Sequence, residues 1–195
     1  MARLFLLALF VLLVAGVTLA IRSCDRHASE TEQSAAKVDP KAADAVIGLP
    51  DGATLIAAKG SIGRRLIDWL SSSEGSSETF EVGGREFPKG SAAPTPEGAG
   101  RIPRLVAILH GYPDVDILVV GHAEPSGDAV ADATLSRARA QYVVGELRKA
   151  GIAENRLSLR GAGSLEPLPA DSPLRSEGAS NDRVSLKLTR RKESS

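Results

Sequence analysis

The stretch "GHAEPSGDAVADATLSRARA", residues 121–140, joins an apolar run to an amphipathic pattern. The run that leads into it, "VDILVVG" at 115–121, is almost continuously apolar, which is typical of a strand buried on both faces. After it, apolar residues recur at helical spacing and predict a helix over residues 135–149, ended by Gly151. A buried strand followed by a helix indicates an α/β domain and sets the frame for the rest of the chain.

The flanking sequence supplies the other elements of this domain. "TFEVGGREF", residues 79–87, predicts a hairpin-like entry. "TPEGAGRIPRLVAILHGYP" predicts a helix capped by Thr95, and its interior Pro103 leaves open a start of the regular helix at that residue. "NRLSLRG" and "DRVSLKLT", at 155–161 and 182–189, predict the last two strands.

The order β-α-β-α-β-β predicts an α/β domain, an α+β two-layer sandwich with two main helices on one face of a mixed sheet. We expect it to span residues 78–189, followed by a tail at 190–195. Residues 47–77 before it predict a small accessory region with a turn, a short strand, a helix and a linker. In that region Ser61 is the expected helix cap, and Trp69 is expected to pack in the core rather than to contact a ligand.

The N-terminal part predicts a membrane segment. Residues 4–21, "LFLLALFVLLVAGVTLAI", contain no charge and nearly match the hydrocarbon thickness of a bilayer. We therefore expect residues 1–24 to be a retained anchor with a cytoplasmic N-terminus, while cleavage after Ala20 and lipid attachment at Cys24 stay open. Residues 25–46 are polar and predict a flexible tether.

Composition excludes several classes of function. The 24 basic and 24 acidic residues balance, which argues against nucleic-acid binding. A single cysteine excludes an intrachain disulfide, and the three histidines lack the short spacing of a zinc enzyme, so we expect no metal and no cofactor. The membrane segment carries no ionisable residue for an ion relay, which argues against a stator-type ion channel.

The opening stretch also contains a candidate binding site. Asp132 or Thr134 is the expected cap of the helix, whose face places Arg139 near the surface. Glu124 and Arg139 could then flank one cleft beyond the end of the strand, complementary to an amino-acid group with both ammonium and carboxylate. A structural ion pair or two unrelated surface charges is the alternative interpretation.

Residues 78–189 resemble the OmpA C-terminal-like domain, a family that includes peptidoglycan-associated lipoproteins and flagellar stator subunits. The resemblance rests on elements that occur in the family's order and spacing: Gly121-His122, Gly127, Leu135-Ser136, Arg139-Ala140, Gly151-Ile152, Gly161, Gly163, Pro167, Asn181 and Arg183-Val184.

The resemblance implies noncovalent binding of peptidoglycan through the diaminopimelate residue of its stem peptide. On this basis Glu124 faces the ligand's ammonium and Arg139 its carboxylate, while Asp132, Asn181 and Arg183 complete the site. The implied location is a Gram-negative-type envelope, with the domain in the periplasm and the anchor in the inner rather than the outer membrane. The protein would tether that membrane to the cell wall.

Departures from the family pattern favour a second hypothesis. Glu124 is one methylene longer than the family's aspartate, Ala123 lacks a hydroxyl, and Asp132 and Asp182 add negative charge. The alternative is an interaction or scaffold domain with a degenerate pocket, whose 47–70 region meets an envelope protein. An enzyme is not expected, because Glu124 with Asp128 or Asp132 lacks an accompanying nucleophile, base or metal cluster.

Overall fold

The computed structural model describes residues 45–170, 172–176 and 178–191. The predicted membrane segment, Cys24 and nearly all of the predicted tether lie outside these residues. Within them, no helix has both the length and the apolar character needed to cross a membrane.

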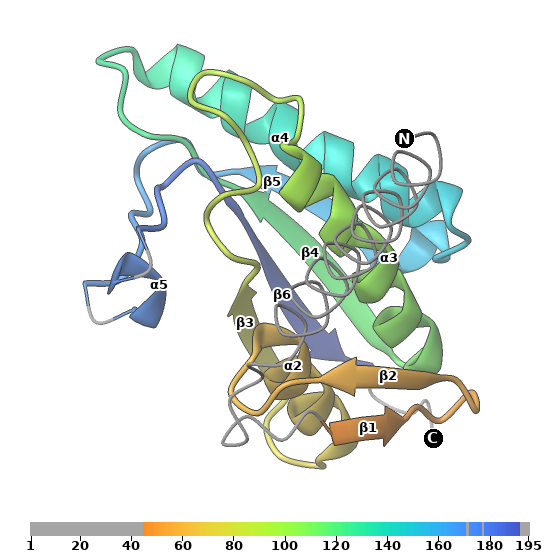
Figure 1. Ribbon diagram of the computed structural model, residues 1–195. Helices are drawn as coiled ribbons and strands as arrows, with labels where there is room; N and C mark the ends of the chain where they lie inside the picture. The colour runs from red at the N-terminus through yellow and green to blue at the C-terminus, as the bar shows by residue number, and fades with distance from the viewer. Residues whose placement is uncertain (1–44, 171, 177, 192–195) are drawn as a thin grey trace, which may run out of the picture. The chain divides into compact units, whose positions relative to one another are not determined.

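The described residues form two sheets and several helices (Figure 1). In chain order the elements are β1 (Ala45–Gly48), β2 (Thr54–Ala57), α2 (Ile62–Ser71), β3 (Ser77–Glu81), α3 (Pro96–Gly111), β4 (Val115–Gly121), α4 (Ala129–Lys149), the 3₁₀ helix η1 (Glu154–Arg156), β5 (Leu157–Gly161), α5 (Pro173–Ser176) and β6 (Val184–Arg190).

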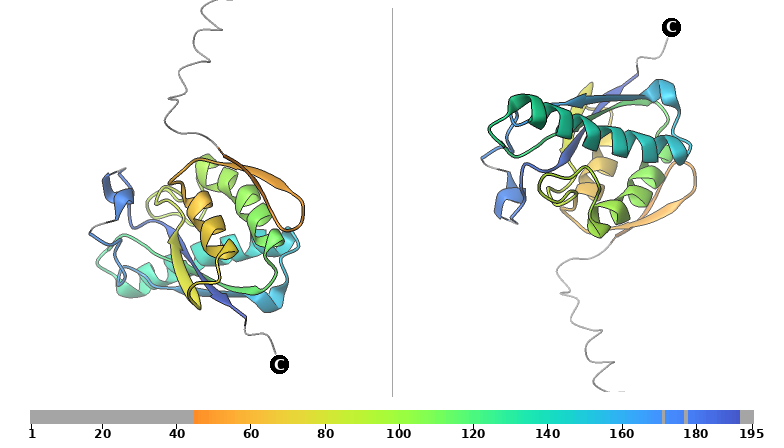
Figure 2. Two further views of the ribbon diagram at one scale, coloured as in Figure 1. Left: turned by 90° about the horizontal axis from the view of Figure 1, so that it is seen from below. Right: turned by 90° about the horizontal axis from the view of Figure 1, so that it is seen from above.

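The main sheet has the strand order β3-β6-β4-β5. Strand β6 runs antiparallel to both β3 and β4, whereas β4 and β5 are parallel and are joined through α4. Helices α3 and α4 cover one face of this sheet (Figure 2). The two-layer α/β arrangement with a mixed sheet is therefore confirmed. Among the described strands β3 pairs only with β6, so the hairpin predicted over 79–87 is wrong.

The hydrophobic core lies between the sheet and these helices. The central strands carry its innermost side chains, and the inward positions predicted on β6, Val184, Leu186 and Leu188, are fully buried. Helix α3 runs unbroken through Pro103, which sits on its exposed side. The hydrogen bond that proline cannot donate is thus missing where water can replace it, and the helix begins at the Thr95 cap.

The region before residue 77 shares this core. Leu66, Ile67 and Leu70 of α2 are buried in the same cluster as Phe80 of β3, and the Trp69 ring meets Phe80 edge to face. Ser61 caps α2 as predicted, accepting a hydrogen bond from the Arg64 amide. The sequence places a boundary at residue 78, but the apolar face of α2 is covered by the domain itself.

Candidate binding site at the carboxyl edge of the sheet

Three loops meet at one edge of the main sheet. They are residues 122–128 after β4, residues 162–172 after β5, and residues 178–183 before β6, with 171 and 177 outside the described residues. Parallel strands end at the same edge, and the antiparallel β6 begins there, so the topology gathers all three loops. Every site residue predicted from the sequence lies on these loops or on the adjoining part of α4.

Helix α4 begins six residues earlier than predicted. Its cap is Asp128, whose Oδ1 accepts hydrogen bonds from the amides of Val130 and Ala131 at 2.9 and 3.1 Å. The predicted caps, Asp132 and Thr134, are therefore wrong. The first turn, "AVADAT", lacks the apolar spacing that marks a helix in sequence, which explains the missed start.

Asp132 binds the loops together rather than facing outward. Its buried carboxylate accepts hydrogen bonds from the Ser126 hydroxyl at 2.6 Å and the Ser164 hydroxyl at 2.9 Å. The Ser126 bond, followed by the Ser164 bond, lowers the pKa of this carboxyl despite its burial. Asp132 thus links the 122–128 loop to the 162–172 loop through its charged form.

Arg139 lies in the interior, where the prediction had placed it near the surface. Its exposed fraction is 0%, because α4 packs very closely on the sheet at Gly121 and Gly161. A Cβ at Gly121 would overlap the Ser136 carbonyl of α4. The two glycines let this helix face approach the backbone of β4 and β5, and Arg139 is carried inside with it.

Each nitrogen of the buried guanidinium donates at least one hydrogen bond to the protein. It donates hydrogen bonds to the carbonyls of Ser91 (2.8 Å), His122 (2.9 Å) and Pro88 (3.1 Å). Its Nη1 also donates to Asp182 Oδ1 at 2.6 Å, in an ion pair whose side chains are 0% and 5% exposed. The charge that the family resemblance assigns to a ligand carboxylate is neutralised here by Asp182.

The segment before β6 is equally well connected. Asn181 donates its side-chain amide to the Ala123 carbonyl at 2.8 Å, and its oxygen accepts from Arg183. Arg183 is 1% exposed and pairs with Glu81 of β3 at 2.7 Å. Arg183 therefore fastens β6 to β3 from inside the domain, away from the surface of the site.

His122, part of the Gly121-His122 element but not among the predicted site residues, is also buried in this cluster. Its Nε2 forms a 2.9 Å hydrogen bond with the Ser185 hydroxyl, and its Nδ1 has no partner among the described residues. Burial, reinforced by the positive charge of Arg183, lowers the pKa of His122 to about 4. The imidazole is consequently neutral at physiological pH.

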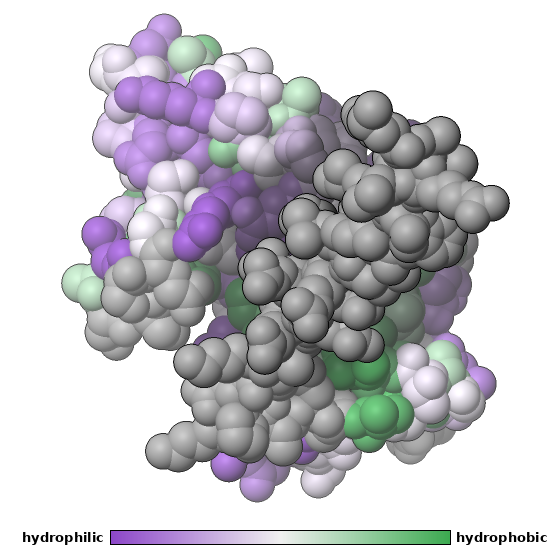
Figure 3. All heavy atoms as spheres, viewed as in Figure 1, coloured by the Kyte–Doolittle hydropathy of each residue, from purple (hydrophilic) through white to green (hydrophobic). Residues whose placement is uncertain are grey.

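Glu124, like Asn181, is a predicted site residue that borders open space. Its half-buried carboxylate accepts a 2.6 Å hydrogen bond from the backbone amide of Asn181, and this bond fixes the direction of the carboxylate. It lines a hollow of about 240 Å³ between the three loops. The residues around this hollow are Glu124, Pro125, Ser164, Pro167, Leu168, Arg175, Ala179 and Asn181. In Figure 3 the surface around the start of α4, on the left of the molecule, is mainly hydrophilic.

Arg175 is the charged residue of this hollow that the sequence analysis missed. It sits on the four-residue helix α5, and its guanidinium donates to the carbonyls of Leu168 and Pro169. No motif marks it, since it lies in a proline-rich loop with no regular spacing.

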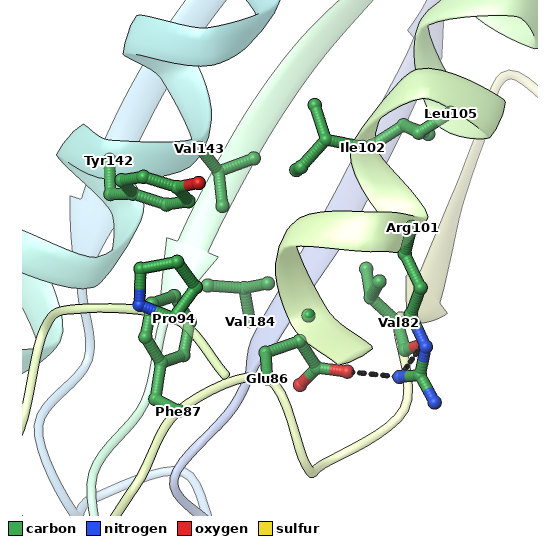
Figure 4. Close-up of a pocket in the computed structure, with 11 residues that line it drawn as sticks. Val82, Glu86, Phe87, Pro94, Arg101, Ile102, Leu105, Tyr142, Val143 and Val184 are labelled. Carbon is green, nitrogen blue, oxygen red and sulfur yellow. Dashed lines mark hydrogen bonds and ion pairs between the residues drawn. The ribbon is translucent and has the colours of Figure 1, made fainter. Parts of the chain in front are cut away.

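A second hollow, under α3, is unsuited to a ligand (Figure 4). Its volume of about 20 Å³ has room for little more than one water molecule. Glu86 lines it and pairs with Arg101 at 2.5 Å, while burial raises the pKa of the Glu86 carboxyl. Among the described residues, no group of three or more His, Cys, Asp and Glu side chains is arranged to hold a metal ion.

The fold and the loop hollow define a two-layer α/β domain with a candidate site at the carboxyl ends of its parallel strands. Residues 86–181, just under half of the chain, match the model of the OmpA family. The match confirms the resemblance deduced from the sequence.

The chain is also similar to individual proteins, in sequence or in structure. Probable lipoprotein YiaD of Escherichia coli is 28% identical over 103 residues, which are 53% of this chain and 47% of YiaD, so the chain spans about half the length of that relative. The periplasmic domain of Helicobacter pylori MotB is similar in structure, with a TM-score of 0.50, 23% identity, and coverage of 61% of this chain and 77% of that one. The peptidoglycan-associated lipoprotein from Burkholderia pseudomallei has a TM-score of 0.47 and 19% identity, covering 53% and 87% of the two chains.

Proposed function

We propose that this protein is an envelope protein whose OmpA-family domain binds peptidoglycan noncovalently, through the diaminopimelate residue of the stem peptide. Residues 4–21 would hold it in the inner membrane, with the domain in the periplasm, so that the membrane is tethered to the cell wall. The location is supported by the periplasmic domain of MotB, by lipoprotein YiaD and by the apolar N-terminal run.

The observation that carries the proposal is the setting of Glu124. Its carboxylate borders the 240 Å³ hollow and is aimed by the Asn181 amide. A half-buried carboxylate at an accessible hollow is complementary to the free ammonium group of diaminopimelate. Asp132, Asn181 and Arg183 then serve the site by holding its loops in register, and Arg139 does the same from beneath.

Retention on purified peptidoglycan sacculi tests this function. The full chain in mild detergent should cosediment with diaminopimelate-containing sacculi, and Glu124→Gln should bind at least about tenfold more weakly. Glu154→Gln is the matched control, because Glu154 is an exposed glutamate on η1, at the opposite end of β5. Equal retention of wild type and Glu124→Gln would contradict a role for Glu124.

One observation favours the second candidate, a scaffold domain that no longer binds the wall. Asp182 neutralises the arginine that the family resemblance assigns to the ligand carboxylate. A partner surface for such a scaffold is available on the β1–β2 hairpin, where Val46 and Ile56 face each other across the ladder at 69% and 57% exposure. Figure 3 shows apolar surface over this hairpin. Failure of the wild-type chain to bind sacculi would favour this candidate.

A further inference from the structure

We infer that Arg175 receives the carboxylate of the ligand's amino-acid centre, in the place that the family resemblance gives to Arg139. The inference rests on the proposed function, because it assigns the second charged contact of the same hollow. It is carried by the positions of the two arginines relative to the open space.

Arg139 is excluded from this role by its surroundings. It is 0% exposed, and it donates to three backbone carbonyls as well as to Asp182. A ligand carboxylate would have to displace a buried carboxylate at 2.6 Å and open the helix–sheet contact above it. Removing one member of a buried ion pair is costly, so the Arg139–Asp182 pair stays closed.

Arg175 has the complementary setting. It is exposed and lines the same 240 Å³ hollow as Glu124. Its Nε and Nη2 donate to the carbonyls of Leu168 and Pro169 at distances of 2.5–3.0 Å, and these bonds orient the guanidinium. The two carbonyls carry no net charge, so these bonds do not neutralise the guanidinium, and within residues 45–170, 172–176 and 178–191 no ion pair is formed by Arg175.

The loop that carries Arg175 is anchored to the domain. Leu168 and Leu174 are buried at 4% and 7% exposure, and the Ala179 amide donates to the Leu174 carbonyl at 2.9 Å. The arginine is thus positioned before any ligand arrives, which limits the entropy lost on binding.

The lining of the hollow defines the ligand class. An acid and a guanidinium border one space whose remaining walls include Pro125, Pro167 and Leu168. The charged pair matches a group that carries ammonium and carboxylate on one carbon, and the apolar walls suit a short methylene chain beyond it. The volume is about twelve times that of the hollow under α3, which is sufficient for such an end group. The free end of a diaminopimelate side chain has this chemistry.

Binding of two stem peptides to the full chain in detergent tests the inference. One tetrapeptide carries meso-diaminopimelate with its free side-chain carboxylate, and in the other that carboxylate is amidated. Wild type should prefer the free carboxylate by about tenfold. Arg175→Gln should bind both peptides equally, because the group that reads the carboxylate is gone. Arg175→Lys, which keeps the charge but loses the planar fork, should retain part of the preference.

Loss of the preference also separates recognition from mere support of the loop, since a loosened loop would weaken both peptides alike. Arg160→Gln, another exposed arginine near the site, is the control and should keep the full preference. An Arg175→Gln variant that still prefers the free carboxylate overturns the Arg175 inference and leaves peptidoglycan binding intact. A wild type that binds both peptides equally does the same, and one that binds neither peptide nor sacculi overturns both proposals.

Discussion

Two arginines near the same loops lie in opposite environments. Arg139 is fully buried beneath the site and ion-paired with Asp182, whereas Arg175 is exposed at the hollow and held by backbone carbonyls. The motif pointed to Arg139, and no motif pointed to Arg175. The comparison shows that an arginine keeps its positive charge when it is buried but can no longer bind a ligand. A buried cation has to be paired with an acid of the protein itself.

The largest expected effect on stability comes from removing the partner of the buried Arg139. Asp182→Asn leaves the Arg139 charge buried and unpaired, so the free energy of unfolding should fall by about 3–5 kcal/mol. Chemical denaturation of the full chain, followed by the fluorescence of Trp69, measures this loss. Asp116→Asn, which breaks the exposed pair with Arg191, is the control and should cost about 1 kcal/mol or less. If Asp182→Asn costs less than about 1 kcal/mol, the buried pair does not contribute to stability.

The buried His122 should make the stability of the domain sensitive to acid. Its pKa is about 4 in the folded protein and 6.5 in an unperturbed histidine, so the unfolded chain binds more protons between these values. Stability is therefore full above pH 6.5 and falls as the pH drops toward 4. Between about pH 7.5 and 5 the loss should be about 2 kcal/mol.

The pH dependence is best measured as a difference between wild type and His122→Gln. The raised pKa of Glu86 acts in the opposite direction and is common to both proteins. The stability of His122→Gln should vary less over this range. Parallel curves for the two proteins would contradict the assignment to His122.

An exposed ion pair at the surface should contribute much less to the free energy of unfolding. Arg160 and Glu166 form two hydrogen bonds of 2.7 and 2.9 Å, yet both side chains are 48% exposed. Glu166→Gln should lower the unfolding free energy by about 1 kcal/mol or less, and added salt should reduce even this difference. A cost comparable with that of Asp182→Asn would remove the contrast between inner and outer charges.

The outer arginine should have the smallest effect on stability. Arg175→Gln should change the free energy of unfolding by about 0.5 kcal/mol or less, because Arg175 is exposed and water can replace its bonds to the Leu168 and Pro169 carbonyls. Thermal unfolding of this variant next to Asp182→Asn checks the comparison directly. A large loss of stability for Arg175→Gln would instead mark it as a structural residue.

How much the sequence could predict depends on how local the determining interactions are. Strand β4 was predicted with its observed bounds, since seven consecutive residues carry the signal. The start of α4 was missed because its first residues, "AVADAT", lack the apolar spacing of an amphipathic helix, and because its cap, Asp128, lies between two other acids, Glu124 and Asp132. The predicted membrane segment and tether were not tested, because they fall almost entirely outside the described residues.

The sequence by itself determined the family, the α/β class and the central strands, because apolar periodicity and motif order are properties of neighbouring residues. Only the tertiary structure decided which charges face the ligand space. Gly121 and Gly161 let α4 approach the sheet, Arg139 was thereby buried, and Asp182, forty-three residues further along the chain, became its partner. That outcome follows from long-range packing and from the free-energy cost of burying an unpaired charge, which spacing along the chain does not express.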